Sequence, residues 1–499
     1  MNTKQLRKKI LDLAIHGKLV PQDSSDEPAS VLLERVHAEK ERLIKEGKIK
    51  RDKKDSTITR AADKSRYGKL LYEIPENWCW AKIIDIAVLK SGGQYQLGND
   101  DNSYLYIKVS DMNKKNNLTE INISDVRCTC KTSELVPINS IIFPKRGGAI
   151  LTNKKRLNIK HPIAIDSNIM ALTPFSGVEL LYVRLWLESF DLSQLWTGNV
   201  VPQINNQDIY PLYIPIPPLA EQHRIISAIE SAFAVIDEIE RNKTDLQSAV
   251  AATKQKILSL AIRGKLVKQD PNDESASVLL ERIRSEREKL INDGKIKRGK
   301  GDSAVIRGGD SPYYEKIDDK VAFIDAQIPF DVPDGWVWAR LDNVTNIIMG
   351  QSPAGDSVTD NAEGVEFHQG KIFFTDRFLA ESRQYTSESN KIVDKNSVLL
   401  CVRAPVGIVN ITNRTIVIGR GLCALSPLGN MSVDFLFHWL TAFYDSFVTQ
   451  ATGTTFIAIT TDVVRQQLVP IPPLTEQCRI TEIIENVLTY LNEINKNIN

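Results

Sequence analysis

Pro215-Ile-Pro-Pro-Leu-Ala-Glu-Gln-His-Arg224 and Pro470-Ile-Pro-Pro-Leu-Thr-Glu-Gln-Cys-Arg479 are two copies of one element in a chain of 499 residues. In each copy, apolar residues recur with helical spacing after the proline pair. Proline lacks an N–H group yet fits the first turn of a helix, so the pair indicates where a helix begins. The same junction therefore occurs twice, which indicates an internal repeat.

Two further repeats accompany this junction. Residues 10–51 and 257–298 are identical at 29 of 42 aligned positions, and Pro75-Glu-Asn-Trp78-Cys-Trp80 corresponds to Pro333-Asp-Gly-Trp336-Val-Trp338. Between the tryptophan element and the proline element the similarity falls to scattered positions. The chain thus consists of two nearly identical frames around two divergent inserts. Identical frames suggest identical partners, and divergent inserts suggest two different targets.

The inserts are predicted to be mixed, mostly β domains. Ile141-Ile-Phe143 and Thr415-Ile-Val-Ile418 are short β-branched and aromatic runs typical of buried strands. Residues 180–190 and 435–447 each have the pattern of one amphipathic helix.

The frames are predicted to be long helices. Apolar residues spaced alternately by four and three continue for about five heptads after Pro218, which favours a coiled-coil seam. An amphipathic core helix beneath a globular domain is the alternative. The predicted seam comprises Ile225, Ile229, Ile236, Ile239, Leu246, Val250, Ile257 and Leu260, then Ile480, Ile484, Val487, Leu491, Ile494 and Ile498, and finally Leu6, Ile10 and Leu13.

The two ends of the chain match one continuous internal stretch. Residues 470–499 match 215–244, and the N-terminal residues match from Ser248 onward, so only three equivalents are missing. We therefore expect the termini to meet and complete a second spacer helix, antiparallel to 219–262, about a pseudo-two-fold axis. Repeats broken by gene fusion are the alternative.

The predicted fold class is α+β, with two mostly β domains joined by two antiparallel spacer helices in a circular arrangement. The connectors exceed usual loop lengths and are expected to be mobile linkers. The first, rich in Lys and Arg, could contact phosphates or be a solvated charge run. The expected divisions are a helical frame (1–51), a basic linker (52–69), the first domain (70–216), a central spacer (217–293), a second linker (294–325), the second domain (326–471) and a C-terminal helix (472–499).

Composition and motifs argue against catalysis. The 63 basic and 62 acidic residues leave a net charge of +1, so a nucleic-acid partner would require local basic patches. The six cysteines and six histidines lack metal-ligand spacing, and reduced thiols are expected. We find no phosphate-binding loop, dinucleotide fingerprint, methyltransferase tetrapeptide or restriction-nuclease motif. No stretch is long and apolar enough for a membrane helix, which predicts a cytoplasmic protein.

Several motifs together resemble the specificity subunit of type I restriction–modification enzymes. They are the duplicated Pro-Ile-Pro-Pro-Leu-x-Glu-Gln-x-Arg-Ile, Gly350-Gln-Ser-Pro353, Tyr106-Ile-Lys-Val-Ser-Asp-Met112, Leu399-Leu-Cys-Val-Arg-Ala-Pro-Val-Gly407, and Ile418-Gly-Arg-Gly-Leu-Cys-Ala-Leu425. The resemblance covers essentially the whole chain, and the inserts match less well than the frames.

The resemblance implies a prokaryotic, non-catalytic DNA reader whose two target-recognition domains each bind half of a split asymmetric site. It implies two modification subunits, which use S-adenosylmethionine, and restriction subunits, which hydrolyse ATP with Mg²⁺ and translocate and cut DNA. The chain itself would need no cofactor or metal. A solitary bipartite DNA-binding protein and a protein-only coiled-coil scaffold remain alternatives.

Base edges and phosphates are bound by polar and basic side chains. The candidate DNA-binding residues are Gln94, Gln96, Lys145, Arg146, Asn199 and Gln203 in the first insert, and Gln351, Lys371, Arg403, Arg420, Thr454 and Thr455 in the second. Each of them could equally be a structural turn or strand residue.

Overall fold

In a computed structural model the chain forms two compact units, residues 1–242 and 243–499. Their boundary lies inside helix α6 (Leu219–Ile262), so each unit contains one insert domain and part of α6. The structure describes residues 2–51, 72–98, 103–152, 154–195, 201–296, 303–308, 312–317, 320–388, 391–453 and 457–498.

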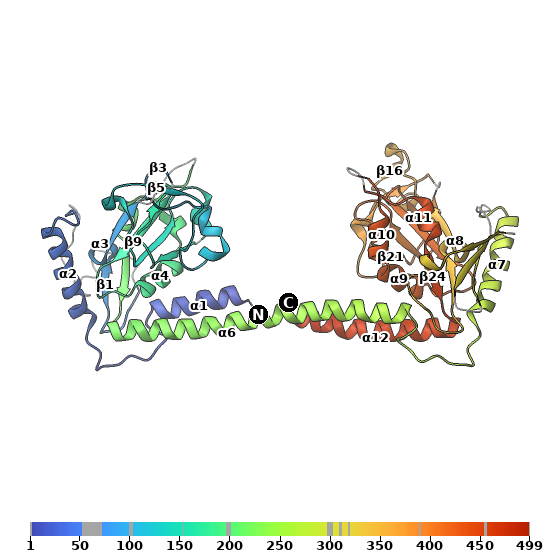
Figure 1. The fold of residues 1–499 in the computed structure, drawn as a ribbon, viewed down its shortest axis with the longest axis horizontal. Coiled ribbons are helices and arrows are strands. Elements are labelled where there is room, and N and C mark those ends of the chain that lie inside the picture. The colour runs from blue at the N-terminus through green and yellow to red at the C-terminus, as the bar shows by residue number, and fades with distance from the viewer. Residues whose placement is uncertain are drawn as a thin grey trace. The chain divides into compact units, whose positions relative to one another are not determined.

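The first insert domain has two sheets and a terminal strand pair (Figure 1). The order β2-β9-β6-β7 forms an antiparallel sheet, and β3-β5-β4-β8 forms a second one in which β4 and β8 run parallel. Strands β1 and β10 pair antiparallel and bring the two ends of the insert together. The elements are β1 Cys79–Lys82, α3 Ile83–Ile86, β2 Ala87–Ser91, β3 Gln96–Leu97, β4 Tyr104–Ile107, β5 Arg127–Thr129, β6 Ser140–Pro144, β7 Arg156–Asn158, β8 Ala164–Ile165, β9 Ile169–Pro174, α4 Leu180–Ser189, α5 Asn206–Ile209 and β10 Tyr213–Ile216.

The second insert domain repeats this topology although the two sequences diverge. Its sheets have the orders β15-β23-β20-β21 and β16-β18-β17-β22-β19, and β14 pairs with β24. The prediction of two mixed domains is confirmed. The elements are β14 Val337–Arg340, α8 Leu341–Val344, β15 Thr345–Met349, β16 Val358–Thr359, β17 Val365–His368, β18 Tyr385–Thr386, β19 Ile392–Val393, β20 Ser397–Cys401, β21 Val409–Thr412, β22 Ile416–Ile418, β23 Leu422–Pro427, α9 Val433–Ala442, α10 Tyr444–Gln450, α11 Thr461–Gln466 and β24 Leu468–Ile471.

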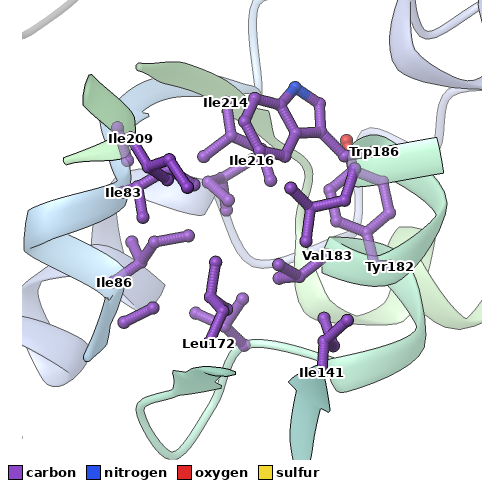
Figure 2. Packing of buried hydrophobic residues seen from close by; sticks show 14 of the residues in the cluster. Ile83, Ile86, Ile141, Leu172, Tyr182, Val183, Trp186, Ile209, Ile214 and Ile216 are labelled. Atoms are coloured by element: carbon purple, nitrogen blue, oxygen red, sulfur yellow. The ribbon is translucent and has the colours of Figure 1, made fainter. Parts of the chain in front are cut away.

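The core of the first domain lies between its antiparallel sheet and α4. All residues of β6 are buried because successive side chains point to opposite faces of the sheet and both faces are covered: Ile141 and Phe143 belong to the cluster beside α4, and Ile142 belongs to a second cluster with Ile107 and Ile165. Burial of such side chains contributes about 1.5–3 kcal/mol each. Figure 2 shows Ile83, Ile86, Ile141, Leu172, Tyr182, Val183, Trp186, Ile209, Ile214 and Ile216 converging on this core.

Each unit contains an antiparallel pair of helices beside its insert domain. In the first unit α1 (Thr3–Ile15) lies along the first part of α6, and Arg7 binds Asp237 at 2.5 Å. In the second unit α12 (Leu474–Ile498) lies along the last part of α6, where Lys254 Nζ donates to Asn492 Oδ1 at 2.5 Å (Figure 1). Two shorter helices, α2 (Ala29–Lys45) and α7 (Ala276–Asn292), pack against α3 and α8.

The predicted seam is buried over only part of its length. Ile225, Ile229, Ile236, Val250, Ile480 and Ile484 are buried, but Ile239, Leu246 and Ile494 are 38%, 45% and 40% exposed. These three lie near the ends of the paired stretches, where a single neighbouring helix covers little of the surface. In α1, Leu11 and Ala14 are the buried residues because this helix also packs against α4, whereas Leu6, Ile10 and Leu13 are half-buried. The helices thus combine the two predicted characters, a helix–helix seam and a core helix beneath a domain. Ile257, Leu260, Val487, Leu491 and Ile498 are half-buried.

The duplicated proline element anchors each insert domain to its spacer helix. At the start of α6, buried Glu221 accepts hydrogen bonds from the Trp78 indole at 2.9 Å and from Gln22 at 2.6 Å. At the start of α12, Glu476 accepts the same bonds from Trp336 at 2.9 Å and Gln269 at 2.8 Å. We call each set of three residues an anchor cluster.

A buried glutamine follows each anchor glutamate and fixes the next helix of the insert. Gln222 Oε1 accepts the backbone N–H of Glu179 at 3.0 Å, just before α4, and Gln477 Oε1 accepts that of Ser432 at 2.9 Å, just before α9. The repeated Glu-Gln pair therefore holds the insert domain in one orientation on its helix.

The second linker departs from its prediction. Within 294–325, strands β11 (Ser303–Arg307), β12 (Tyr313–Ile317) and β13 (Lys320–Phe323) form an antiparallel sheet. Buried Glu315 of β12 forms a bidentate ion pair with Arg340 of β14, at 2.7 and 3.1 Å. The prediction of a mobile linker is wrong for these strands, because they form a sheet that the Glu315–Arg340 ion pair joins to the domain. The basic linker 52–69 lies outside the described residues.

Candidate nucleic-acid interface

A three-residue turn between β8 and β9 joins several loops of the first insert. Residues 166–168 follow β8, and the turn closes when Ile169 N–H donates to Asp166 O at 2.8 Å. Gly92 N–H donates to Ile169 O at 3.0 Å, and Gly93 N–H donates to Ile165 O at 3.1 Å. Lys145 N–H donates to Asn168 O at 2.8 Å. We call residues 166–168, and their equivalents below, the central turn.

The second insert has the same backbone arrangement with different side chains. The central turn is Gly419-Arg420-Gly421, closed by Leu422 N–H donating to Gly419 O at 3.0 Å. Gly350 N–H donates to Leu422 O at 2.9 Å, and Gln351 N–H donates to Ile418 O at 3.0 Å. Val402 N–H donates to Gly421 O at 3.0 Å. Four backbone hydrogen bonds are thus shared by the two domains.

Gly92 and Gly350 each lie where a second backbone, that of the central turn, approaches too closely for a side chain. A Cβ atom at Gly92 would lie 2.1 Å from Asp166 O, and one at Gly350 would lie 2.1 Å from Gly419 O. Both distances are far below van der Waals contact, so a side chain at either position would force the loops apart.

A further loop pair flanks each central turn. In the first insert, Gly147 N–H donates to Pro202 O and Ile204 N–H donates to Lys145 O, so Arg146 faces Gln203 in the bridge. In the second insert, Ala404 N–H donates to Ile457 O and Ile459 N–H donates to Val402 O, so Arg403 faces Ala458.

The structure brings together many of the residues predicted from sequence. Lys145, Arg146 and Gln203 share one bridge beside the first central turn, and Gln94 follows Gly93 in the same loop. Gln351, Arg403 and Arg420 surround the second central turn, and exposed Lys371 follows the neighbouring strand β17. Gln96 instead lies exposed on β3, paired with Thr129. Asn199, Thr454 and Thr455 lie outside the described residues.

The basic residues of this group differ from the structural cations of the same domains. Arg340 and Arg414 are committed to the carboxylates Glu315 and Glu366. Within the ranges that the structure describes, Lys145, Arg146, Lys371, Arg403 and Arg420 form no ion pair. Burial and the neighbouring Arg146 lower the pKa of Lys145, so an anion beside it would be stabilising.

Two residues of the second site were missed from sequence. Ser352 Oγ donates to Gln369 Oε1 at 2.8 Å and lies 3.4 Å from both the backbone N and Nε of Arg420. Gln369 follows β17 and is exposed. Ser352 was within a recognised motif, but the similarity between the inserts is too weak at Gln369 to indicate its position.

A buried ion cluster supports the strand that carries Gln369. Arg414 donates to both carboxylate oxygens of Glu366 on β17, and Ser382 N–H donates to Glu366 Oε1 at 2.8 Å. Burial alone would raise the pKa of Glu366, but the hydrogen bonds from Arg414, Ser382 and His368 outweigh it and lower the pKa to about 2. These contacts therefore fix the position of β17, the strand that leads to Gln369.

Among the described residues, no cluster of His, Cys, Asp and Glu has the geometry of a metal site, and no helix is long and apolar enough to cross a membrane. What the loops offer chemically is a set of hydrogen-bond donors and positive charges that suits recognition of base edges and phosphates.

Comparison with known proteins identifies relatives of the whole chain. The sequence profile described as "Type I restriction modification DNA specificity domain" matches residues 75–247 and 333–499. The EcoAI type I restriction enzyme specificity subunit of Escherichia coli is 25% identical, covering 98% of this chain and 90% of the relative. The corresponding EcoEI subunit, also from Escherichia coli, is 28% identical and covers 70% of this chain and 63% of the relative.

Solved structures share the fold. A chain from a study of complex assembly and conformational transition of the type I R-M system has a TM-score of 0.59 at 21% identity, and covers 86% of this chain and 94% of that one. The HsdS subunit from Thermoanaerobacter tengcongensis has a TM-score of 0.52 at 20% identity, with coverages of 86% and 93%.

Proposed function

Because this chain belongs to the type I restriction modification DNA specificity family, we propose that each insert domain recognises one half of a bipartite, asymmetric DNA site. DNA sequence recognition by two domains is the function of this specificity subunit. The finer assignment, one half-site per domain, rests on one observation. Both domains keep the same four backbone hydrogen bonds around the central turn but present different side chains there.

The spacer helices would set the distance between the half-sites. Helix α6 has 44 residues, which corresponds to about 66 Å at 1.5 Å per residue. This length accommodates two DNA-reading domains separated by a helical turn or more of one duplex.

The duplicated frame would dock two modification subunits, because two copies of one surface bind two copies of one partner. S-adenosylmethionine would be bound by those subunits, and ATP and Mg²⁺ by restriction subunits that join the assembly. The chain alone would then transfer no methyl group, cut no DNA and hydrolyse no ATP. We place it in the cytoplasm of a prokaryotic cell, together with its DNA.

Domain exchange tests this function. We expect that replacing residues 70–216 with the first insert of another family member changes one half of the recognised site and leaves the other half intact. Randomised duplex DNA selected by the full-length chain, at fixed salt, provides the measurement. A simultaneous change in both halves would contradict the division of labour. A wild-type chain without salt-dependent affinity for duplex DNA would favour a protein-only scaffold.

A further inference from the structure

The central turns differ in chemistry even though their backbones are held identically. In the first domain Asp166 Oδ1 accepts from the backbone N and the Nδ2 of Asn168, at 2.8 and 2.6 Å, so the turn carries a carboxylate. In the second domain Gly419 replaces the aspartate, and Arg420 occupies the position of Ser167. One turn therefore offers hydrogen-bond acceptors, whereas the other offers only donors.

Arg420 is exposed, and both its backbone and its side chain contact Ser352. Its backbone N and its Nε both lie 3.4 Å from Ser352 Oγ, and Ser352 in turn donates to Gln369. A Cβ atom at Gly421 would lie 2.5 Å from Gln369 O, so the loops press directly against the turn. These contacts involve the backbone and Nε, and within the described ranges the two terminal nitrogens of the guanidinium have no protein acceptor.

We propose that Arg420 reads a guanine in the half-site of the second domain, and that the central turn is the specificity-determining element in both domains. The proposal rests on the DNA-recognition function proposed above. A guanidinium matches the O6 and N7 acceptors of guanine in a bidentate manner, which is the commonest specific side-chain contact in the major groove. Ser352 and Gln369 are positioning residues that fix the orientation of Arg420.

The alternative role for an exposed arginine is a phosphate contact. A phosphate contact weakens binding to all sequences about equally and adds to the salt dependence, whereas a base contact determines one position of the site. The two roles are therefore separable by measuring base preference position by position.

The experiment compares Arg420→Ala, Arg420→Lys and a charge-matched control, Lys395→Ala, in the full-length chain. Lys395 is exposed and precedes β20 at the end of that strand opposite Val402. Each protein selects from a randomised duplex library, and its affinity is then measured on the selected wild-type site and on single-base variants. Thermal unfolding verifies that each variant is folded.

We expect Arg420→Ala to lose the preference for guanine at one position of one half-site, with about 10- to 100-fold less discrimination. Arg420→Lys should recover the charge but only part of the preference, because an ammonium lacks the bidentate geometry. Lys395→Ala should keep the full preference. Uniformly weaker binding by Arg420→Ala with unchanged base preferences would overturn the proposal, as would unchanged binding.

A transfer experiment strengthens the test. The triple variant Asp166→Gly, Ser167→Arg, Asn168→Gly places the second turn in the first domain, and we expect a new guanine preference in the first half-site. A folded variant that keeps the original preference there would contradict the role of the turn. If the wild-type chain selects no sequence at all, the proposed function fails, and that result is distinct from failure of the turn alone.

Discussion

At the scale of single residues, the repeated motif is explained by hydrogen bonds that link distant parts of each unit. Glu221 and Glu476 are buried carboxylates, and each is satisfied by an indole and an amide from segments roughly 140 to 200 positions away in sequence. Burial raises the pKa of both glutamates, and the hydrogen bonds from the tryptophan and glutamine oppose this rise. The glutamate found in both copies thus follows from the cost of leaving one of its buried partners unpaired.

Removing the indole donor should destabilise the anchor cluster. We expect Trp78→Phe to cost about 1–3 kcal/mol, because Glu221 loses one of its two side-chain donors. Losing this donor raises the pKa of Glu221 further, so the penalty grows as the pH rises and the carboxylate ionises. Urea unfolding at several pH values measures the effect, and Trp336→Phe should reproduce it in the second unit. Trp80→Phe, whose ring packs against Tyr72, serves as the control and should lack the pH dependence.

The ion cluster of the second domain predicts a dependence on pH in a more acidic range. The pKa of Glu366 is lowered to about 2, so its stabilising contribution is present above the ordinary glutamate pKa and is lost as the pH falls towards 2. Glu366→Gln should remove this slope and cost about 3–5 kcal/mol at neutral pH, since Arg414 is left without its carboxylate. Hydrogen exchange of residues 365–370 measures local stability. Exposed Glu363→Gln should leave it unchanged, and a slope that persists in Glu366→Gln would assign the effect elsewhere.

At the scale of elements, α6 has two roles. Each of its ends packs within a different unit, and the uninterrupted helix joins the two units. In each unit an antiparallel neighbour covers only part of the helix. The boundary after Asn242 therefore offers a place to change the length of α6 without altering the contacts of Arg7 with Asp237 or of Lys254 with Asn492.

Lengthening the spacer should change the distance between half-sites. Seven residues inserted after Asn242 add about 10 Å and nearly two whole turns, so the helix faces are kept. We expect the selected DNA site to gain about three base pairs of spacer while both half-sites stay the same. An insertion of two residues turns the helix faces apart by about half a turn and should abolish binding to the bipartite site. An active seven-residue variant with an unchanged spacer would show that the helices only dock partners.

At the scale of the whole molecule, the broken repeat predicts a circular arrangement. Helices α1 and α12 each run antiparallel to α6 within their own unit, and together they match one continuous stretch of the internal frame except for three residues. The structure supports the pairing in each unit separately, and the meeting of the two termini remains a prediction.

Circular permutation tests the prediction that the two termini meet. We expect a chain in which a short helical connector joins Asn499 to Met1, and which opens between Gln247 and Ser248, to fold and to keep its DNA specificity. DNA selection and thermal unfolding provide the measurements. The matched control opens at the same position without the connector and should lose the fixed spacing. A permuted protein that binds single half-sites without fixed spacing would refute the circular arrangement.

The sequence by itself determined the duplication, the two divergent domains and the extent of the long helix, which was predicted after Pro218 and observed as Leu219–Ile262. These features are local: a helix is specified by the spacing of apolar residues over a few turns, and a repeat by direct comparison. Length, by contrast, was misleading within 294–325, where β11, β12 and β13 form a sheet that the Glu315–Arg340 ion pair joins to β14.

Only the tertiary structure decided which loops share a site. The central turn is defined by backbone hydrogen bonds between segments such as 92–93, 145 and 165–169, which lie far apart in sequence. Their pairing depends on sheet order, which no local pattern encodes, and their side chains vary because the hydrogen bonds do not require them. For the same reason Gln369 could not be found from the repeat, whereas Glu221 and Glu476 could, since there the side chains themselves make the contacts.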